Sequence, residues 1–204
     1  TLRAEVGAHV SLGIGDRATL QRMHDFAEGE TPFVPLLERA GAHDLAAQWA
    51  AQDPHDVKVQ QWEFPDTWLE ADHQIVVGGR DLCAVSTPGH TRGHFVFADT
   101  SDGLLFAGDH VLPTITPSVG FEGDPSDQPL GDFLSSLAKV RAMPDLRVLP
   151  AHGPVGMSSH TRVDELLEHH EHRLALCLDV VRAGERTAYQ VATQLPWTRR
   201  NHEL

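Results

Sequence analysis

The sequence is poor in cysteine, in long apolar runs and in positive charge. Its 2 cysteines, Cys83 and Cys177, lie far apart and lack Cys-x-x-Cys spacing, so reduced thiols in a cytoplasmic protein are favoured over a disulfide. No apolar run approaches the roughly 18–20 residues of a membrane span, and the N-terminus shows no signal-peptide pattern. Lys and Arg number 16 against 29 Asp and Glu, giving a formal charge of −13. This balance repels phosphate backbones and disfavours nucleic acid as a partner, and the lack of apolar runs predicts no membrane association.

The length of 204 residues suits one sizeable domain with a small appendage. No internal repeat is present at periods of 20–50 residues. The chain starts at Thr1 without an initiator Met, as expected of a trimmed or incomplete chain.

Hydrophobic periodicity predicts strands in the middle of the chain and helices toward both ends. Such an order is typical of an α/β or α+β layered domain. We expect helices near residues 18–27, 36–52 (broken near Gly41), 134–143, 161–182 and 187–195, and strands near 8–12, 57–64, 74–77, 82–86, 94–98, 103–107 and 147–149. Gly78-Gly79 indicates a hairpin between two of these strands, and residues 113–131 a long loop.

Three segments place a potential metal ligand directly after a predicted strand. They are TPGHTRGH with His90, LLFAGDH with Asp109, and VLPAHGP with His152. Each is weak alone, because a histidine after a Pro-Gly turn is often a loop residue and an Asp after Gly is often a turn former. Three such segments in succession, each with its candidate ligand at a strand end, indicate a functional site on rigid support. His94 is expected to brace the first loop, whereas His110 suits either the cleft or a structural role.

The three segments resemble the later motifs of the metallo-β-lactamase superfamily, including glyoxalase II-like thioesterases. The hairpin ADHQIVVGGRDLCAVSTPGH resembles the family as well, and the resemblance runs over about residues 1–160. It implies the C-terminal part of a four-layer αββα sandwich with a zinc site, often dinuclear. It also implies that His90 binds the first metal, that Asp109 bridges both and is catalytic, and that His152 binds the second. The hydroxide held by these metals would attack a carbonyl or phosphoryl centre.

The family's His-x-His-x-Asp-His motif has no counterpart in this sequence. His24-Asp25 is the only His-Asp pair near the start, and no histidine precedes it at the right spacing. The resemblance therefore predicts that this motif and most of the first sheet lie upstream of Thr1. Residues 172–197 resemble a winged-helix-like extension of one branch of the family. We thus expect a metallo-β-lactamase-like domain over 1–160 and a helical extension over 161–204, itself cut short.

Three functions remain open at this stage. The first is a zinc-dependent hydrolase of an ester, thioester, lactam or similar bond in a small molecule. The second is an inactive truncated remnant acting as an assembly module, since an uncovered sheet face favours a homodimer. The third is a nuclease of the same superfamily, which would need a basic groove that the sequence does not show. In each case three ligands divided between two sites should retain metal weakly.

Overall fold

The computed structural model describes residues 2–25, 33–51 and 63–197. The chain divides into two compact units, one formed by Thr1–Phe26 with Val59–Leu167 and the other by Ala27–Lys58 with Glu168–Leu204. The described elements of the first unit are α1 Leu2–Val6, β1 Ser11–Gly13, η1 Ile14–Asp16, α2 Arg17–Asp25, β2 Thr67–Leu69, β3 His73–Val77, β4 Arg80–Ser86, β5 Phe95–Asp99, β6 Leu104–Gly108, α5 Pro129–Arg141, β7 Arg147–Pro150 and the start of α6 Ser159–Arg182.

The main sheet has five strands in the order β3-β4-β5-β6-β7. Its first three pairings are antiparallel and β6 pairs with β7 in parallel. The hairpin between β3 and β4 turns at Gly78 and Gly79, which have φ of 58° and 80°. Positive φ at both central residues suits the right-handed strand twist, so the predicted hairpin is confirmed. The parallel pair needs a crossover, which α5 provides.

A separate parallel pair joins β1 to β2, with Leu12 opposite Trp68. The strand expected over residues 8–12 is therefore found at Ser11–Gly13, and β2 at Thr67–Leu69 was not predicted. Most of the strand expected at 57–64 lies outside the described residues, and positions 63 and 64 are not in a strand.

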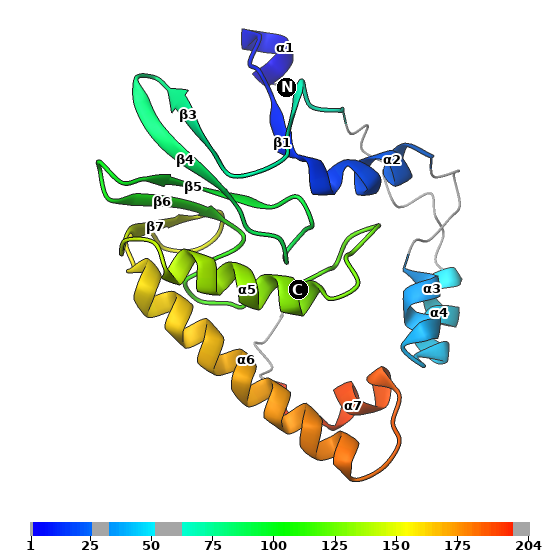
Figure 1. Cartoon of the computed structure of the whole chain (residues 1–204). Helices are drawn as coiled ribbons and strands as arrows, with labels where there is room; N and C mark the ends of the chain where they lie inside the picture. Colours follow the sequence, from blue (N-terminus) through cyan, green and yellow to red (C-terminus); the bar gives the residue numbers. More distant parts are fainter. Residues whose placement is uncertain (1, 26–32, 52–62, 198–204) are drawn as a thin grey trace. The chain divides into compact units, whose positions relative to one another are not determined.

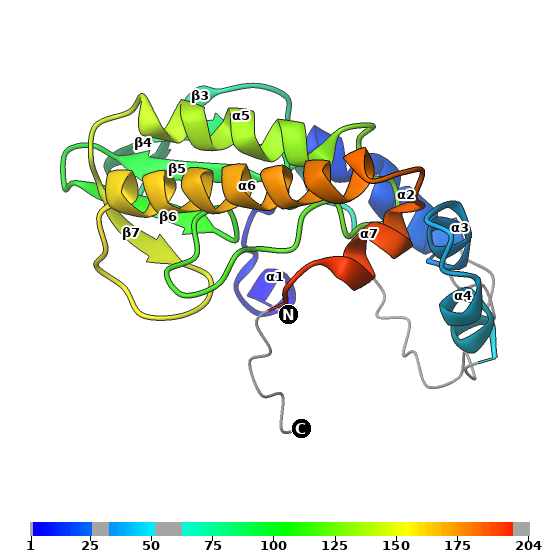
Figure 2. The same ribbon diagram turned by 90° about the horizontal axis from the view of Figure 1, so that it is seen from below.

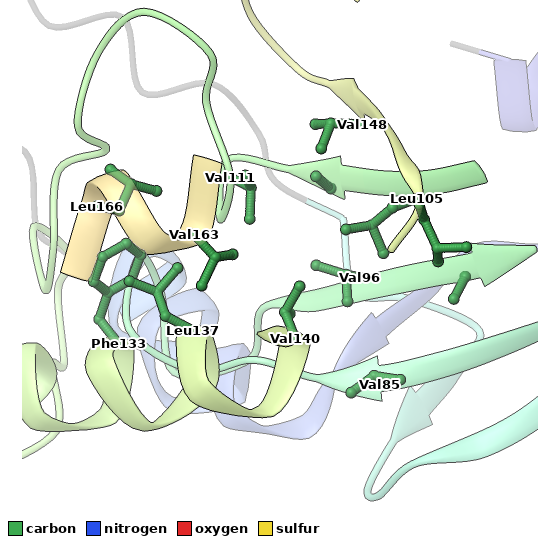
Figure 3. Close-up of a cluster of buried hydrophobic side chains, with 13 residues drawn as sticks. Val85, Val96, Leu105, Val111, Phe133, Leu137, Val140, Val148, Val163 and Leu166 are labelled. Atoms are coloured by element: carbon green, nitrogen blue, oxygen red, sulfur yellow. The ribbon is translucent and has the colours of Figure 1, made fainter. Parts of the chain in front are cut away.

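One face of the main sheet packs against α5 and the start of α6 (Figures 1 and 2). Alternate residues of β5 and β6 point into this core, where they meet apolar residues of the two helices (Figure 3). The cluster includes Val96, Leu105, Phe133, Leu137, Val140, Val163 and Leu166, all almost fully buried. Each large side chain contributes about 1.5–3 kcal/mol when fully buried, so this layer is the main support for the loops at the sheet edge.

The second unit is helical in its described part, with α3 Val34–Arg39, α4 His43–Ala50, the later turns of α6 and α7 Ala188–Gln194. The break expected near Gly41 is confirmed between α3 and α4. Gly41 has a φ of 78°, and a Cβ there would lie 2.7 Å from Thr187. Thr187 begins α7 with a capping box to Gln190, and Arg173 lies 4.3 Å from the ring centre of Trp197. The domain boundary at residue 160 and the winged-helix resemblance stay predictions.

The cysteines and the lengths of the helices can be compared with the sequence predictions over the described residues. Cys83 and Cys177 are both free, as the sequence predicted. No helix within residues 2–25, 33–51 and 63–197 is long and apolar enough to cross a membrane. The cytoplasmic compartment stays a prediction.

Candidate metal site

The topology brings the three motif loops to one edge of the sheet. Strands β4 and β6 run in the same direction, because each is antiparallel to β5, and β7 is parallel to β6. The C-terminal ends of these three strands therefore share an edge. His90 follows β4, Asp109 follows β6 and His152 follows β7, so strand order alone explains why residues far apart in sequence meet.

The carboxylate of Asp109 lies between the two histidines. Its Oδ2 is 3.7 Å from Nε2 of His90, and its Oδ1 is 3.3 Å from Nε2 of His152. The side chains of His90 and Asp109 are 27% and 29% exposed, whereas that of His152 is 69% exposed. The site is thus half-buried on one side and open to solvent at His152.

A backbone carbonyl orients the ring of His90. Its Nδ1 lies 2.8 Å from the carbonyl oxygen of Ser118, to which it donates a hydrogen bond. In the neutral ring the proton is then on Nδ1, which leaves Nε2, the nitrogen nearest Asp109, as the one able to bind a metal. Metal-binding histidines are usually held in this way, with the second ring nitrogen bonded to a carbonyl or carboxylate.

His94 joins the loop of residues 87–94 to the end of β6. Its Nε2 accepts a hydrogen bond of 3.2 Å from the backbone N–H of Asp109, and its Nδ1 lies 2.9 Å from Oγ1 of Thr87. Burial, helped by His90 and opposed by Asp109, lowers the pKa of His94 to about 4. The ring is therefore neutral at neutral pH, so that Nδ1–H donates while Nε2 accepts. This is a bracing position between the loop of His90 and the end of β6 that carries Asp109.

His110 lies in the core, not at a surface cleft. The residue is fully buried, and its ring meets Phe133 of α5 edge-on at a centroid distance of 5.1 Å. Burial lowers the pKa of His110 to about 3. Of the two placements that the sequence left open, the structure shows the interior one.

Two glycines let the loops approach their supports. Gly89 has a φ of 144°, and a Cβ there would lie 2.5 Å from the Cβ of Phe133. Gly108 has a φ of 51°, and its Cβ would lie 2.7 Å from Nε2 of His94. Larger residues would therefore push the loop of His90 off α5 and Asp109 away from His94.

A buried carboxylate that the sequence did not single out fastens the surrounding loops. Glu122 is 6% exposed. Its Oε2 accepts from the hydroxyl of Thr19 at 2.9 Å and its Oε1 from the backbone N–H of Arg92 at 2.8 Å. Burial raises the pKa of Glu122, while these two hydrogen bonds oppose the shift. A single Glu in a Pro- and Gly-rich loop carries no periodic or motif signal, so only the folded structure reveals this contact.

The donors at this edge match zinc in kind, since zinc binds imidazole and carboxylate groups. They do not match it in number. Over residues 2–25, 33–51 and 63–197 no group of three or more His, Cys, Asp or Glu is arranged to hold a metal ion. Among the described residues, Asp109 thus contacts His90 and His152, but these side chains do not form a complete metal coordination shell.

Comparisons with known proteins agree with this fold. Residues 28–152 match the model of the metallo-beta-lactamase superfamily. The beta-lactamase-like protein 2 homolog of Caenorhabditis elegans is 31% identical over 147 residues, which are 70% of this chain and 46% of that protein. The hydroxyacylglutathione hydrolase of Bartonella henselae is 36% identical over 88 residues, covering 41% of this chain and 31% of that enzyme.

Solved structures show the same architecture. A metallo-beta-lactamase family protein from Thermus thermophilus superimposes with a TM-score of 0.72 at 26% identity, covering 93% of this chain and 61% of that one. A beta-lactamase domain protein from Burkholderia ambifaria gives a TM-score of 0.71 at 23% identity, covering 91% and 53%. The chain spans about half the length of the C. elegans relative, 46%. The mixed α/β fold, the family model and these relatives confirm the resemblance in the motifs, and the chain belongs to the metallo-β-lactamase superfamily.

Proposed function

We propose that the chain carries part of the active site of a metal-dependent hydrolase, with His90, Asp109 and His152 as zinc ligands. The observation that carries the proposal is the position of Asp109, which presents one carboxylate oxygen to each imidazole at 3.7 Å and 3.3 Å. A carboxylate placed in this way suits a ligand shared by two metals. The orientation of His90 by the carbonyl of Ser118 supports it independently.

The chain's own residues would hold and orient the reacting groups. His90 offers an Nε2 lone pair fixed by its Nδ1 hydrogen bond, and the backbone of Asp109 is held by His94. When bound, zinc would supply Lewis-acid activation of water and of a substrate carbonyl. Because the described ligands do not complete a metal shell, we expect this chain to bind zinc weakly and below two ions per chain.

The proposed substrate is a small molecule with an ester, thioester, lactam or similar bond. Support comes from the family and from the hydroxyacylglutathione hydrolase that matches part of the chain. The formal charge of −13 argues against a phosphodiester backbone. A homodimer is proposed as the assembly, and sedimentation over a concentration series tests it.

Zinc titration by calorimetry on the chelator-treated chain tests the site. The variants are Asp109→Asn and His90→Asn, with His73→Asn on β3 as the matched control, since His73 is an exposed histidine whose ring bonds the carbonyl of Ala71. Wild type and control should bind zinc with the same affinity. The two site variants should bind it at least about tenfold more weakly, because each loses one contact to the metal or to its ligands. Equal zinc affinity in all four proteins would refute the assignment.

A further inference from the structure

We propose that Glu122 is a positioning residue, whose carboxylate fastens the two loops that meet at His90. These are the 87–94 loop, which carries His90, and the 111–128 loop, which carries Ser118. The inference rests on the proposed function in one respect, namely that His90 is a ligand worth orienting. Glu122 lies outside the three motifs, in a loop whose sequence shows neither helical nor strand periodicity.

Glu122 belongs to the 111–128 loop and binds the backbone of the 87–94 loop, so it joins the two loops that meet at His90. Along the first loop, Arg92, whose N–H donates to Oε1, is two residues from His90. Along the second, Ser118, whose carbonyl accepts from His90 Nδ1, is four residues from Glu122. The two segments are further tied where Gly120 N–H donates to the carbonyl of Gly89 at 2.9 Å. The carboxylate thus closes a small ring of contacts around the imidazole.

Helix α2 anchors this ring. Thr19 of α2 donates its hydroxyl to Oε2 of Glu122, and Arg22 donates to the carbonyl of Gly123 at 2.7 Å. Just before α2, Asp16 accepts from the N–H of Gly93 at 2.8 Å. The η1–α2 segment therefore holds both loops, Asp16 of η1 binding Gly93 while Thr19 and Arg22 of α2 bind residues 122 and 123. Glu122 contacts this segment and the His90 loop at once.

Burying a carboxylate in this position is unfavourable in free energy. Removing a charged or polar group from water costs free energy that hydrogen bonds must offset. Glu122 is almost fully buried, and the charge of Asp16 also disfavours its ionised form. An apolar residue would avoid the desolvation of a carboxylate but would leave the Thr19 hydroxyl and the Arg92 N–H without this acceptor. The presence of Glu122 at this position is therefore explained by the loop geometry that its two hydrogen bonds fix.

The neighbouring Asp124 provides a matched control. It forms a 2.6 Å ion pair with the guanidinium of Arg92, at side chains that are 34% and 40% exposed. It therefore touches the same residue through its side chain, while Glu122 binds the backbone. A substitution at Asp124 removes a surface charge pair and leaves the backbone hydrogen bond in place.

The test uses the full chain, treated with chelator and uniformly labelled with 15N, above the ordinary pKa of histidine. The imidazole 15N shifts report whether the proton of His90 stays on Nδ1, and amide exchange reports the Arg92 N–H. We expect Glu122→Ala to give a mixture of His90 tautomers and at least about tenfold faster Arg92 exchange, equivalent to one lost hydrogen bond. Glu122→Gln, which still presents an accepting oxygen, should restore both signals. Asp124→Asn should match wild type.

Unchanged His90 and Arg92 signals in folded Glu122→Ala would overturn the proposal. If that variant does not fold, Thr19→Val decides, since it removes only the donor to Oε2 and should shift the same two signals by a smaller amount; no shift there also overturns it. Zinc titration separates this outcome from failure of the proposed function. If Glu122→Ala disturbs His90 while Asp109→Asn leaves zinc affinity intact, the positioning role stands and the metal site fails. If Asp109→Asn loses zinc while Glu122→Ala changes nothing, the reverse holds.

Discussion

Replacing His94 by alanine should separate the residue that braces the loops from the residue proposed to bind metal. The substitution removes two hydrogen bonds, one to Oγ1 of Thr87 and one from the backbone N–H of Asp109. Thr87 is fully buried, so water cannot replace the lost partner of its hydroxyl. Each buried group left unsatisfied costs about 1–3 kcal/mol, and His94→Ala leaves two, so it should lower the free energy of unfolding by about 2–6 kcal/mol.

Urea unfolding of the chelator-treated chain measures this loss, with His90→Ala as the comparison. The His90 side chain is 27% exposed and makes a 2.8 Å bond to one carbonyl, so its removal should cost no more than about 1 kcal/mol. The ranking follows from the contacts alone and needs no metal. A His94→Ala cost below that of His90→Ala would refute the bracing argument.

Three further predictions concern the scaffold. Asp145→Ala removes the carboxylate that accepts from His160 N–H at the start of α6 and should lower the free energy of unfolding in urea by about 1 kcal/mol. Hydrogen bonds, that of His160 first, lower the pKa of Asp145, so the stability it contributes is present above pH 3.8 and is lost as the pH falls through the lowered pKa. The stability of the variant should therefore fall less steeply with acid than that of wild type. Gly89→Ala should lower the melting temperature far more than Gly103→Ala, since a Cβ at Gly89 would clash with α5 at 2.5 Å and one at Gly103 meets nothing within 4 Å; equal shifts would contradict this. Leu105→Ala, at a fully buried position, should cost about 2–5 kcal/mol by the same unfolding assay.

Most strands of the main sheet could be predicted because local patterns determine them, whereas a common site for the three motifs followed from the family resemblance. Alternation and the Gly78-Gly79 pair indicated the hairpin, and short apolar strands ending in a ligand-type residue indicated a site on rigid support. The start of α5 was expected at residue 134 but lies at Pro129. Pro129 belongs to the loop predicted over residues 113–131, but the first turn of a helix tolerates proline because its missing N–H has no partner there.

Other features depend on contacts between distant segments, which a single sequence does not display. Strand β2 is only three residues long and exists because it pairs with β1. Glu122 becomes significant only when Thr19 and the backbone of Arg92 reach it. His110 was ambiguous because burial, and not its neighbours in sequence, decides whether a histidine beside Asp109 faces solvent.

The shared direction of β4, β6 and β7 also leaves the opposite edge of the sheet free for labelling. The exposed Gly78-Gly79 turn lies at the other end of β4, whose seven residues span roughly 20 Å at strand rise. Exposed turns of small residues tolerate added peptide best. An epitope or fluorophore peptide placed in this turn would report on folding of the sheet at a distance from His90, Asp109 and His152.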